Sequence, residues 1–240
     1  MRVLVTRPQP GADRTAKRLR ALGHEAVIVP MSDILPLRSA LPAGKFDAVV
    51  ASSANSFRYL PRDVAERLGT LPFYAVGKET AAVGKQFGFI DPSPGAASAS
   101  DLARDLVADL KAPARVAYIC GAVRMDTLEE QLSAAGISVV AVETYDTQAR
   151  KIPSSEIAEL ERAPIDAVLV YSAKAADALV GVAKPLAGTI FRDTAFIAIS
   201  PRVRDRLVAG GILRVAASAS PDEDAMFELL ARADRRPASF

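Results

Sequence analysis

The sequence predicts an α/β protein built from two similar doubly wound domains, each with a parallel sheet covered by helices on both faces. Short apolar segments that fit buried strands alternate with segments of helical periodicity along the whole chain. Several of these segments recur in the second half, so each half has the size of a small doubly wound domain. A chain of 240 residues, half of them hydrophobic, is large enough to bury two such cores.

The first strand–helix–strand unit shows the pattern clearly. "RVLV" (2–5) is an apolar strand, and the segment after it places apolar residues at helical spacing. Gly23 is expected to close this helix as its C-cap, and "EAVIVP" (25–30) is the next strand. The apolar face of the helix consists of Ala12, Ala16, Leu19 and Leu22.

Later elements repeat earlier ones in pairs. "FDAVVASSANSFRYL" (46–60) begins as a buried strand, turns small and polar, and continues as a helix-like run, and "IDAVLVYSAKAADALV" (165–180) does the same. "RVAYIC" with the helix and strand that follow it (115–145) resembles the first unit. "PFYAVGKETAAVGKQFGF" (72–89) resembles "AFIAISPRVRDRLVAGGI" (195–212). The repeat therefore predicts two sheets of similar construction.

Polar clusters follow the predicted strands at their carboxyl ends, where ligands bind in sheets of this class. Each cluster leads into a predicted helix, whose first N–H groups are unpaired and partly positive. Basic residues in a first turn oppose the helix dipole, which favours an anionic ligand with several carboxylates or phosphates. Alternatively, the serine and asparagine side chains serve only as N-caps and the long basic side chains are solvated. The clusters are Thr6 and Arg7; Ser52, Ser53 and Asn55; Gly77, Lys78 and Thr80; Gly121 and Arg124; Ser172 and Lys174; Ser200 and Arg202.

Composition narrows the function. A net charge of +2 argues against broad binding to nucleic acid or to a membrane. Apolar runs are too short for a signal peptide or a membrane-spanning helix, and one cysteine allows no internal disulfide, so we expect a protein of the reducing cytoplasm. We expect Cys120 to be a buried structural thiol, because no nearby histidine could activate it. His24, the single histidine, falls in a predicted surface turn, so neither a metal site nor a Ser-His-Asp triad is expected.

Two familiar motifs are absent. "VGKET" lacks the glycine that a P-loop needs five residues before Gly77, because Pro72 stands there. There is no GxGxxG motif, so a dinucleotide site is not supported. Glu129 and Glu130 fall within a predicted helix, where we expect a solvated face rather than an acid/base pair.

An ordered set of motifs resembles the uroporphyrinogen-III synthase family. The resemblance implies two flavodoxin-like domains joined by a two-stranded linker, with the substrate in the cleft between them. One domain would be 1–34 plus 148–240 and the other 38–143, with linker strands at 35–37 and 144–147. The motifs, spread over nearly the whole chain in family order, are "VLVTRP", "GHEAVIVP", "SSANS", "AVGKETA", "GAVRMDTLEEQLSAAG", "VETYDTQ" and "AVLVYSAKAADAL".

The same resemblance implies an enzyme. Members of the family are carbon–oxygen lyases that convert linear hydroxymethylbilane to uroporphyrinogen III, without cofactor or metal. They remove the terminal hydroxyl as water, invert the last pyrrole ring through a spiro intermediate, and close the macrocycle. The many carboxylates of this small-molecule substrate match the polyanion site expected at the strand ends. We therefore expect a cytoplasmic monomer without a nucleic-acid or membrane partner.

Motif matches suggest roles for particular residues. Tyr145 matches the family's linker tyrosine and is the best candidate for the catalytic acid, since a phenol stays protonated at neutral pH. The chain departs from the family at Ser200, where glycine is usual, and at Val203, where threonine is usual. The expected substrate-binding residues are Thr6, Arg7, Ser53, Asn55, Gly77, Lys78, Thr80, Gly121, Arg124, Ser172, Lys174 and Ser200.

Two other functions stay open at this stage. A non-catalytic two-domain sensor of a tetrapyrrole or another polyanion would use the same strand ends, and its linker tyrosine would only pack. A solute receptor would do so too, although the missing signal peptide counts against it. The product formed from hydroxymethylbilane discriminates between the enzyme and both alternatives.

Overall fold

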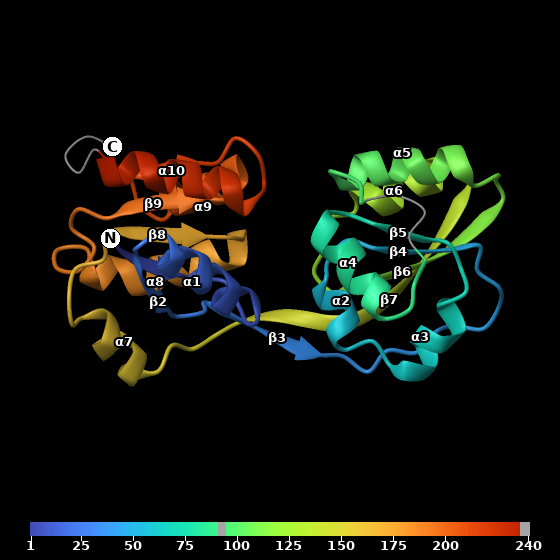
Figure 1. Cartoon of the computed structure of the whole chain (residues 1–240), viewed down its shortest axis with the longest axis horizontal. Helices are drawn as coiled ribbons and strands as arrows, with labels where there is room; N and C mark the ends of the chain where they lie inside the picture. The colour runs from blue at the N-terminus through green and yellow to red at the C-terminus, as the bar shows by residue number, and fades with distance from the viewer. Residues whose placement is uncertain (91–94, 236–240) are drawn as a thin grey trace. The chain divides into compact units, whose positions relative to one another are not determined.

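The computed structural model describes residues 1–90 and 95–235. The chain divides into two compact units, the first formed by 1–34 with 148–240 and the second by 35–147. Each unit is an α/β structure with a mostly parallel sheet between two layers of helices (Figure 1). The predicted α/β fold class with doubly wound sheets is confirmed.

The first unit holds a five-stranded sheet in the order β10-β9-β8-β1-β2, with every neighbouring pair parallel. Counted within the unit, this is the 2-1-3-4-5 order of flavodoxin-like sheets. Its elements are β1 (Arg2–Val5), α1 (Gly11–Ala21), β2 (Glu25–Ile28), α7 (Ser154–Leu160), β8 (Ala167–Val170), α8 (Ala173–Leu186), β9 (Ala195–Ala198), α9 (Pro201–Ala209), β10 (Val215–Ala217) and α10 (Glu223–Arg235).

The second unit holds a five-stranded sheet in the order β3-β7-β6-β4-β5. The β7–β6, β6–β4 and β4–β5 pairs are parallel. Its elements are β3 (Ser32–Pro36), β4 (Ala48–Ala51), α2 (Asn55–Arg58), α3 (Arg62–Leu68), β5 (Phe73–Ala75), α4 (Lys78–Gln86), α5 (Ala99–Asp109), β6 (Ala114–Gly121), α6 (Thr127–Ala134) and β7 (Ile137–Ala149).

Apolar side chains fill both faces of each sheet. In the first unit, α1 and α10 cover one face with residues such as Leu19 and Met226, and α8 and α9 cover the other with Leu179 and Leu207. In the second unit, α5 and α6 cover one face, while α2, α3 and α4 cover the other. A strand that is buried on both faces has a nearly continuous apolar sequence. This explains why "RVLV" and "AVVA" do not alternate between apolar and polar residues.

The repeat seen in the sequence is a repeat of topology. The order β2-β1-β8-β9 in the first unit corresponds to β7-β6-β4-β5 in the second. Matching aspartates mark the correspondence. Asp166 accepts a hydrogen bond from the backbone N–H of Arg2 at 2.5 Å, and Asp47 accepts one from that of Arg115 at 2.7 Å. The first strand–helix–strand unit of the chain therefore pairs with β8, far along the sequence, rather than with β4.

Three details differ from the sequence analysis. The linker strand expected at 144–147 is continuous with the strand before it, because β7 runs without a break from Ile137 to Ala149. Leu22 is not part of the apolar face of α1: the helix ends at Ala21 and the Leu22 side chain is 58% exposed. His24 is only half-exposed, and its Nδ1 lies 3.4 Å from the amino group of Met1.

Cys120 is fully buried at the end of β6, as expected for a structural thiol. Burial raises the pKa of this thiol to about 12. Within the described residues, no helix is both long and apolar enough to cross a membrane. The same residues contain no group of three histidine, cysteine or acidic side chains that could hold a metal ion.

Candidate active site

The carboxyl ends of β4 and β6, with the part of β7 that lies beside them, bring three predicted residues together in the second unit. The β6–β7 register shifts between Cys120 and Gly121, so that Gly121 pairs with Tyr145. The Tyr145 carbonyl accepts a hydrogen bond from the N–H of Ala122 at 2.8 Å, which fixes the strand ends at this point. Ser53 follows the adjacent strand β4 and hydrogen-bonds to the Tyr145 phenol.

The Tyr145 phenol is held on two sides. A Cβ atom added to Gly121 would lie 2.7 Å from Cζ of Tyr145, so only glycine leaves room for the ring. Burial raises the pKa of Tyr145, and the hydrogen bond with Ser53 opposes part of that rise. The phenol is therefore protonated at neutral pH and is restricted in its orientation. These are the properties that a proton donor needs.

Ser53 also organises the start of α2. Its Oγ accepts a hydrogen bond from the N–H of Asn55, the first residue of that helix, at 3.3 Å. One residue earlier, Ser52 hydrogen-bonds to the buried phenol of Tyr118 at 2.6 Å, and burial raises the pKa of Tyr118 to about 12. The sequence analysis did not single out Tyr118, because it lies inside an apolar strand with no polar neighbour to mark it.

Gly77 and Thr80 lie at the beginning of α4 in different environments. Gly77 is the N-cap with φ +78°, a conformation that favours glycine, and its N–H donates to the Ala96 carbonyl at 2.8 Å. That N–H is consequently already engaged. Thr80 is buried at 5% exposure, whereas Lys78 is exposed. The matching residue in α9, Val203, is also buried, so this position faces the core in both units.

Arg124 is occupied by carboxylates of its own chain. Its guanidinium binds Glu129 at 2.8 Å and Glu143 at 2.7 Å, and donates to the Gly121 carbonyl at 3.2 Å. The expectation that Glu129 belongs to a solvated face was wrong, because its side chain is 24% exposed and paired. The two carboxylates balance the positive charge of the Arg124 guanidinium near the end of this sheet.

In the first unit, two predicted residues act through hydrogen bonds inside the fold. Thr6 is fully buried, and its hydroxyl donates to the Leu169 carbonyl at 2.7 Å. Ser172 is the N-cap of α8, and its Oγ accepts from the N–H of Ala175 at 3.1 Å. Lys174 lies in the first turn of the same helix. Ser200 is the N-cap residue of α9, without a side-chain capping bond.

Arg7 belongs to a network centred on Glu223, the first residue of α10. The guanidinium of Arg7 lies 4.6 Å from the ring centre of Tyr171 and 3.3 Å from Glu223 Oε1. The same carboxylate accepts hydrogen bonds from Tyr171 at 2.8 Å, from Arg18 at 2.7 Å and from Thr15. The burial of Glu223 raises its pKa, but these bonds outweigh burial and leave the pKa lowered.

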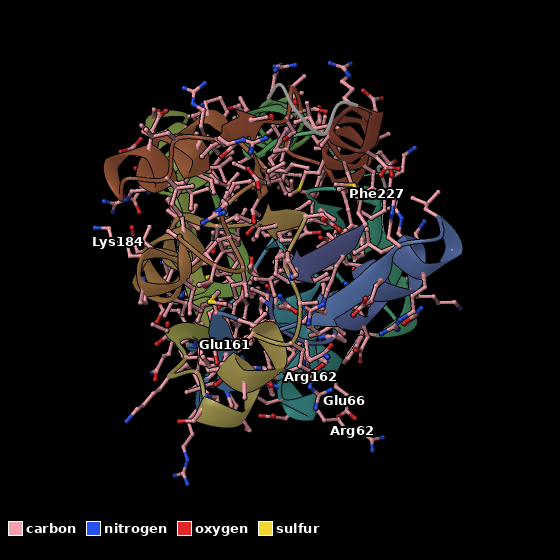
Figure 2. All side chains as sticks on the ribbon, turned by 90° about the vertical axis from the view of Figure 1, so that its left-hand side faces the viewer. Arg62, Glu66, Glu161, Arg162, Lys184 and Phe227 are labelled. Atoms are coloured by element: carbon pink, nitrogen blue, oxygen red, sulfur yellow. The ribbon has the colours of Figure 1, made fainter. Side chains whose placement is uncertain are left out.

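The sequence analysis missed this network. Glu223 carried one signal, since an acidic residue in a first helical turn stabilises the helix dipole. That signal says nothing about its partners, which lie 52 to 216 residues away. Figure 2 labels Phe227, one turn further along α10, whose ring lies 4.4 Å from the Arg18 guanidinium.

A comparison with models of known protein families identifies the family of this chain. The family model HEM4, uroporphyrinogen-III synthase HemD, matches residues 13–228. The chain belongs to this family. Uroporphyrinogen-III synthases are enzymes of tetrapyrrole biosynthesis that act on a small-molecule substrate, so the resemblance found in the sequence is confirmed.

Solved structures of uroporphyrinogen-III synthases share the fold at low sequence identity. The enzyme from Helicobacter pylori 26695 has a TM-score of 0.64 and 16% identity, covering 97% of this chain and 99% of that one. A mutant of the enzyme from the extremely thermophilic bacterium Thermus thermophilus has a TM-score of 0.55 and 16% identity, covering 98% and 99%. A comparison with curated proteins gave no match.

Within a uroporphyrinogen-III synthase, several of the predicted residues separate into three groups. Tyr145 interacts with Ser53 and packs against Gly121 near the carboxyl edge of the second unit. Thr6, Thr80 and Ser172 serve the fold through burial or capping. The two predicted arginines, by contrast, already hold carboxylates of this chain.

Proposed function

We propose that this chain cyclises hydroxymethylbilane to uroporphyrinogen III, with loss of water and inversion of the last pyrrole ring. Membership of the uroporphyrinogen-III synthase family supports this function. The observation that carries the mechanism is the placement of the Tyr145 phenol, which packs against Gly121, interacts with Ser53 and has its pKa raised by burial. This reaction makes the chain a carbon–oxygen lyase.

The proposed role of Tyr145 follows from the leaving group. Hydroxide leaves poorly, so the phenol donates its proton to the terminal hydroxyl, the carbon–oxygen bond breaks, and water departs. The electron pair of the adjacent pyrrole nitrogen stabilises the azafulvene cation that remains. A substituted carbon of the last ring attacks this cation to give the spiro intermediate. Rearrangement inverts the ring, and the proton released as aromaticity returns restores the phenol.

The raised pKa of Tyr145 sets the size of its contribution. A weak acid transfers a proton only when the leaving group is already strongly basic, so Tyr145 assists an ionisation that the pyrrole nitrogen largely drives. The same raised pKa makes the phenolate a good acceptor for the proton that is released later. Ser53 positions the phenol and lowers its pKa toward the useful range.

We propose that the carboxylates of the substrate bind at helix N-termini along the carboxyl edges. Both α4 and α8 begin with a basic residue in the first turn, Lys78 and Lys174, which would complement an anion there. Arg7 and Arg124 would have to exchange Glu223 and Glu143 for substrate carboxylates. Asn55 and Ser200 would contribute by their positions at the starts of α2 and α9. Gly77 and Thr80 would shape the start of α4.

Two further expectations stay predictions: that the protein is a monomer and that it works in the cytoplasm. The alternative function, a non-catalytic sensor, would use the same edges without turnover. One assay separates the two functions. Hydroxymethylbilane closes spontaneously to the symmetric type I isomer, and the purified chain should divert it to type III without added metal or nucleotide.

The comparison is made against a reaction without protein and one with heat-denatured protein. Type III product in the presence of the native chain alone supports the synthase. If native chain that binds the product still leaves only type I isomer, the sensor explains the protein and the synthase proposal fails.

A further inference from the structure

A cavity lies in the first unit away from the candidate active site. It has a volume of about 260 Å³ and lies between the end of α8, the start of β9 and the turn from α9 to β10. Ser172 and Ser200 follow the carboxyl ends of β8 and β9, whereas this cavity is built around the amino end of β9. It therefore serves neither the proton transfer nor the carboxyl-edge binding described above.

The floor of the cavity is apolar and aromatic. Phe191 and Phe196 are 6% and 4% exposed, and their ring centres lie 6.0 Å apart. Ile212 adds an aliphatic wall. Leu213 is 81% exposed at the lip, although it is a large apolar residue in a chain that buries most of its leucines. An exposed leucine beside an aromatic floor offers apolar surface that could pack on the ring of a bound ligand.

The rim of the cavity is basic. Lys184, Arg192 and Arg214 line it, and Arg214 lies near the carboxylate of Asp193. Among the described residues, the side chains of Lys184 and Arg192 have no hydrogen-bond or ion-pair partner. The Arg214–Asp193 distance is 3.6 Å, longer than a hydrogen bond, and Asp193 is 82% exposed, so the pair is weak.

Lys184 is placed at the cavity by its packing. Gly211 has φ +90°, and a Cβ atom there would lie 3.8 Å from Cε of Lys184, so the lysine stem lies over this glycine. Figure 2 labels Lys184 on α8, with its side chain reaching the surface. A lysine in the last turn of α8 also stabilises the helix dipole. That role explains neither Arg192 and Arg214 nor the exposed Leu213.

We propose that this cavity binds a small carboxylate that carries one ring. The ring would lie on Phe191, Phe196 and Ile212 under Leu213, and the acid group would face Arg192 and Arg214. Arginine suits a carboxylate because its planar guanidinium can donate two parallel hydrogen bonds. A volume of about 260 Å³ is just below the usual range for drug-sized ligands, roughly 300–1,000 Å³, so a single ring with a short acidic arm fits.

Phenylacetate tests both halves of this proposal on the full chain. Phenylacetamide keeps the ring but removes the charge, and acetate keeps the charge but removes the ring. Binding is measured by saturation-transfer NMR titration of each compound. We expect phenylacetate to bind at least about fivefold more tightly than either analogue, because it alone satisfies the rim and the floor.

Variants locate the binding. Arg214→Gln should weaken phenylacetate binding by about fivefold and remove its advantage over phenylacetamide. Leu213→Ser should weaken both compounds. Arg104→Gln, in the groove between α5 and α6, and Lys78→Gln, at the carboxyl edge of the second unit, are matched controls that should leave binding unchanged. Melting temperatures establish that each variant is folded.

Three results would overturn the proposal. The first is no saturable binding of phenylacetate. The second is equal binding of phenylacetamide. The third is a loss caused by Lys78→Gln rather than by Arg214→Gln, which would assign the ligand to the candidate active site. Conversion of hydroxymethylbilane is followed in parallel and should persist in Arg214→Gln and Leu213→Ser.

Discussion

The aromatic ring of Tyr145 lies against the backbone of Gly121, on the neighbouring strand. A Cβ atom on Gly121 would be 2.7 Å from Cζ and 3.0 Å from the phenolic oxygen of Tyr145. Real Cβ atoms essentially never approach another atom this closely, so any side chain at position 121 must displace the ring. The position of the proposed proton donor therefore depends on a residue that has no side chain.

Gly121→Ala should consequently lower turnover by about tenfold, because a misplacement near 1 Å is enough to impair a positioned catalytic group. We expect KM to change less than kcat. The matched control is Gly188→Ala, since a Cβ there meets nothing within 4 Å. In a Tyr145→Phe background, Gly121→Ala should reduce turnover much less than it does alone. Equal effects in both backgrounds would mean that Gly121 does not act through the phenol.

Tyr145→Phe keeps the ring and removes the proton donor. Turnover should fall by roughly tenfold to a thousandfold, within or just below the usual effect of a general acid. The residual rate would come from spontaneous ionisation of the bound substrate. Turnover and melting temperature are measured together. Full turnover would remove Tyr145 from the mechanism, and a collapsed melting temperature would identify it as a packing residue.

Ser53→Ala and Ser172→Ala remove the same hydroxyl from different environments. Ser53 bonds to the Tyr145 phenol, so its loss should lower kcat modestly and raise the pKa of Tyr145 further. Ser172 caps α8, so its loss should lower the free energy of unfolding by about 0.5–2 kcal/mol and leave kcat unchanged. Urea denaturation and steady-state kinetics are run on both variants. Identical profiles for the two would contradict this division of roles.

Glu223 should make stability depend on acid pH. Its pKa is lowered in the folded protein, so its contribution is fully present above its unfolded pKa of about 4.3 and is lost as pH falls through the lower folded value. Glu223→Gln should therefore destabilise the chain near neutral pH and flatten the loss of stability below about pH 4.3. Urea midpoints are compared across pH, with exposed Glu130→Gln as the control. A Glu223→Gln curve parallel to that of the unsubstituted chain would show that the network does not depend on this charge.

Fragments test the proposal that the two units are separate folding domains. A fragment of residues 35–147 contains β4 to β7 and both helix layers, so it should unfold cooperatively. A fragment of 1–147 adds β1, α1 and β2 without β8, their partner in the sheet, so those elements should stay unprotected in hydrogen exchange. Protection of β1 in the longer fragment would count against the discontinuous assignment.

The sequence by itself determined the elements and much of their arrangement. Apolar runs such as 2–5 and 46–50 predicted buried strands, because a strand covered on both faces cannot alternate with polar residues. The repeated segments predicted two sheets of matching order. Tyr145, Ser53 and Gly121 were each marked locally, as a linker tyrosine, a hydroxyl after a strand and a glycine at a strand end.

Only the tertiary structure decided which of these side chains meet. The shift of register after Cys120 places Tyr145 on Gly121, and no local pattern encodes that shift. Arg7 could be read as a free cation until Glu223, distant in sequence, was found beside it. The physical reason is that sequence patterns report on neighbouring residues, whereas these contacts join residues that are far apart in the sequence. Periodicity reflects which residues are buried within one element, whereas a side-chain pair depends on the register and packing of elements that the whole chain brings together.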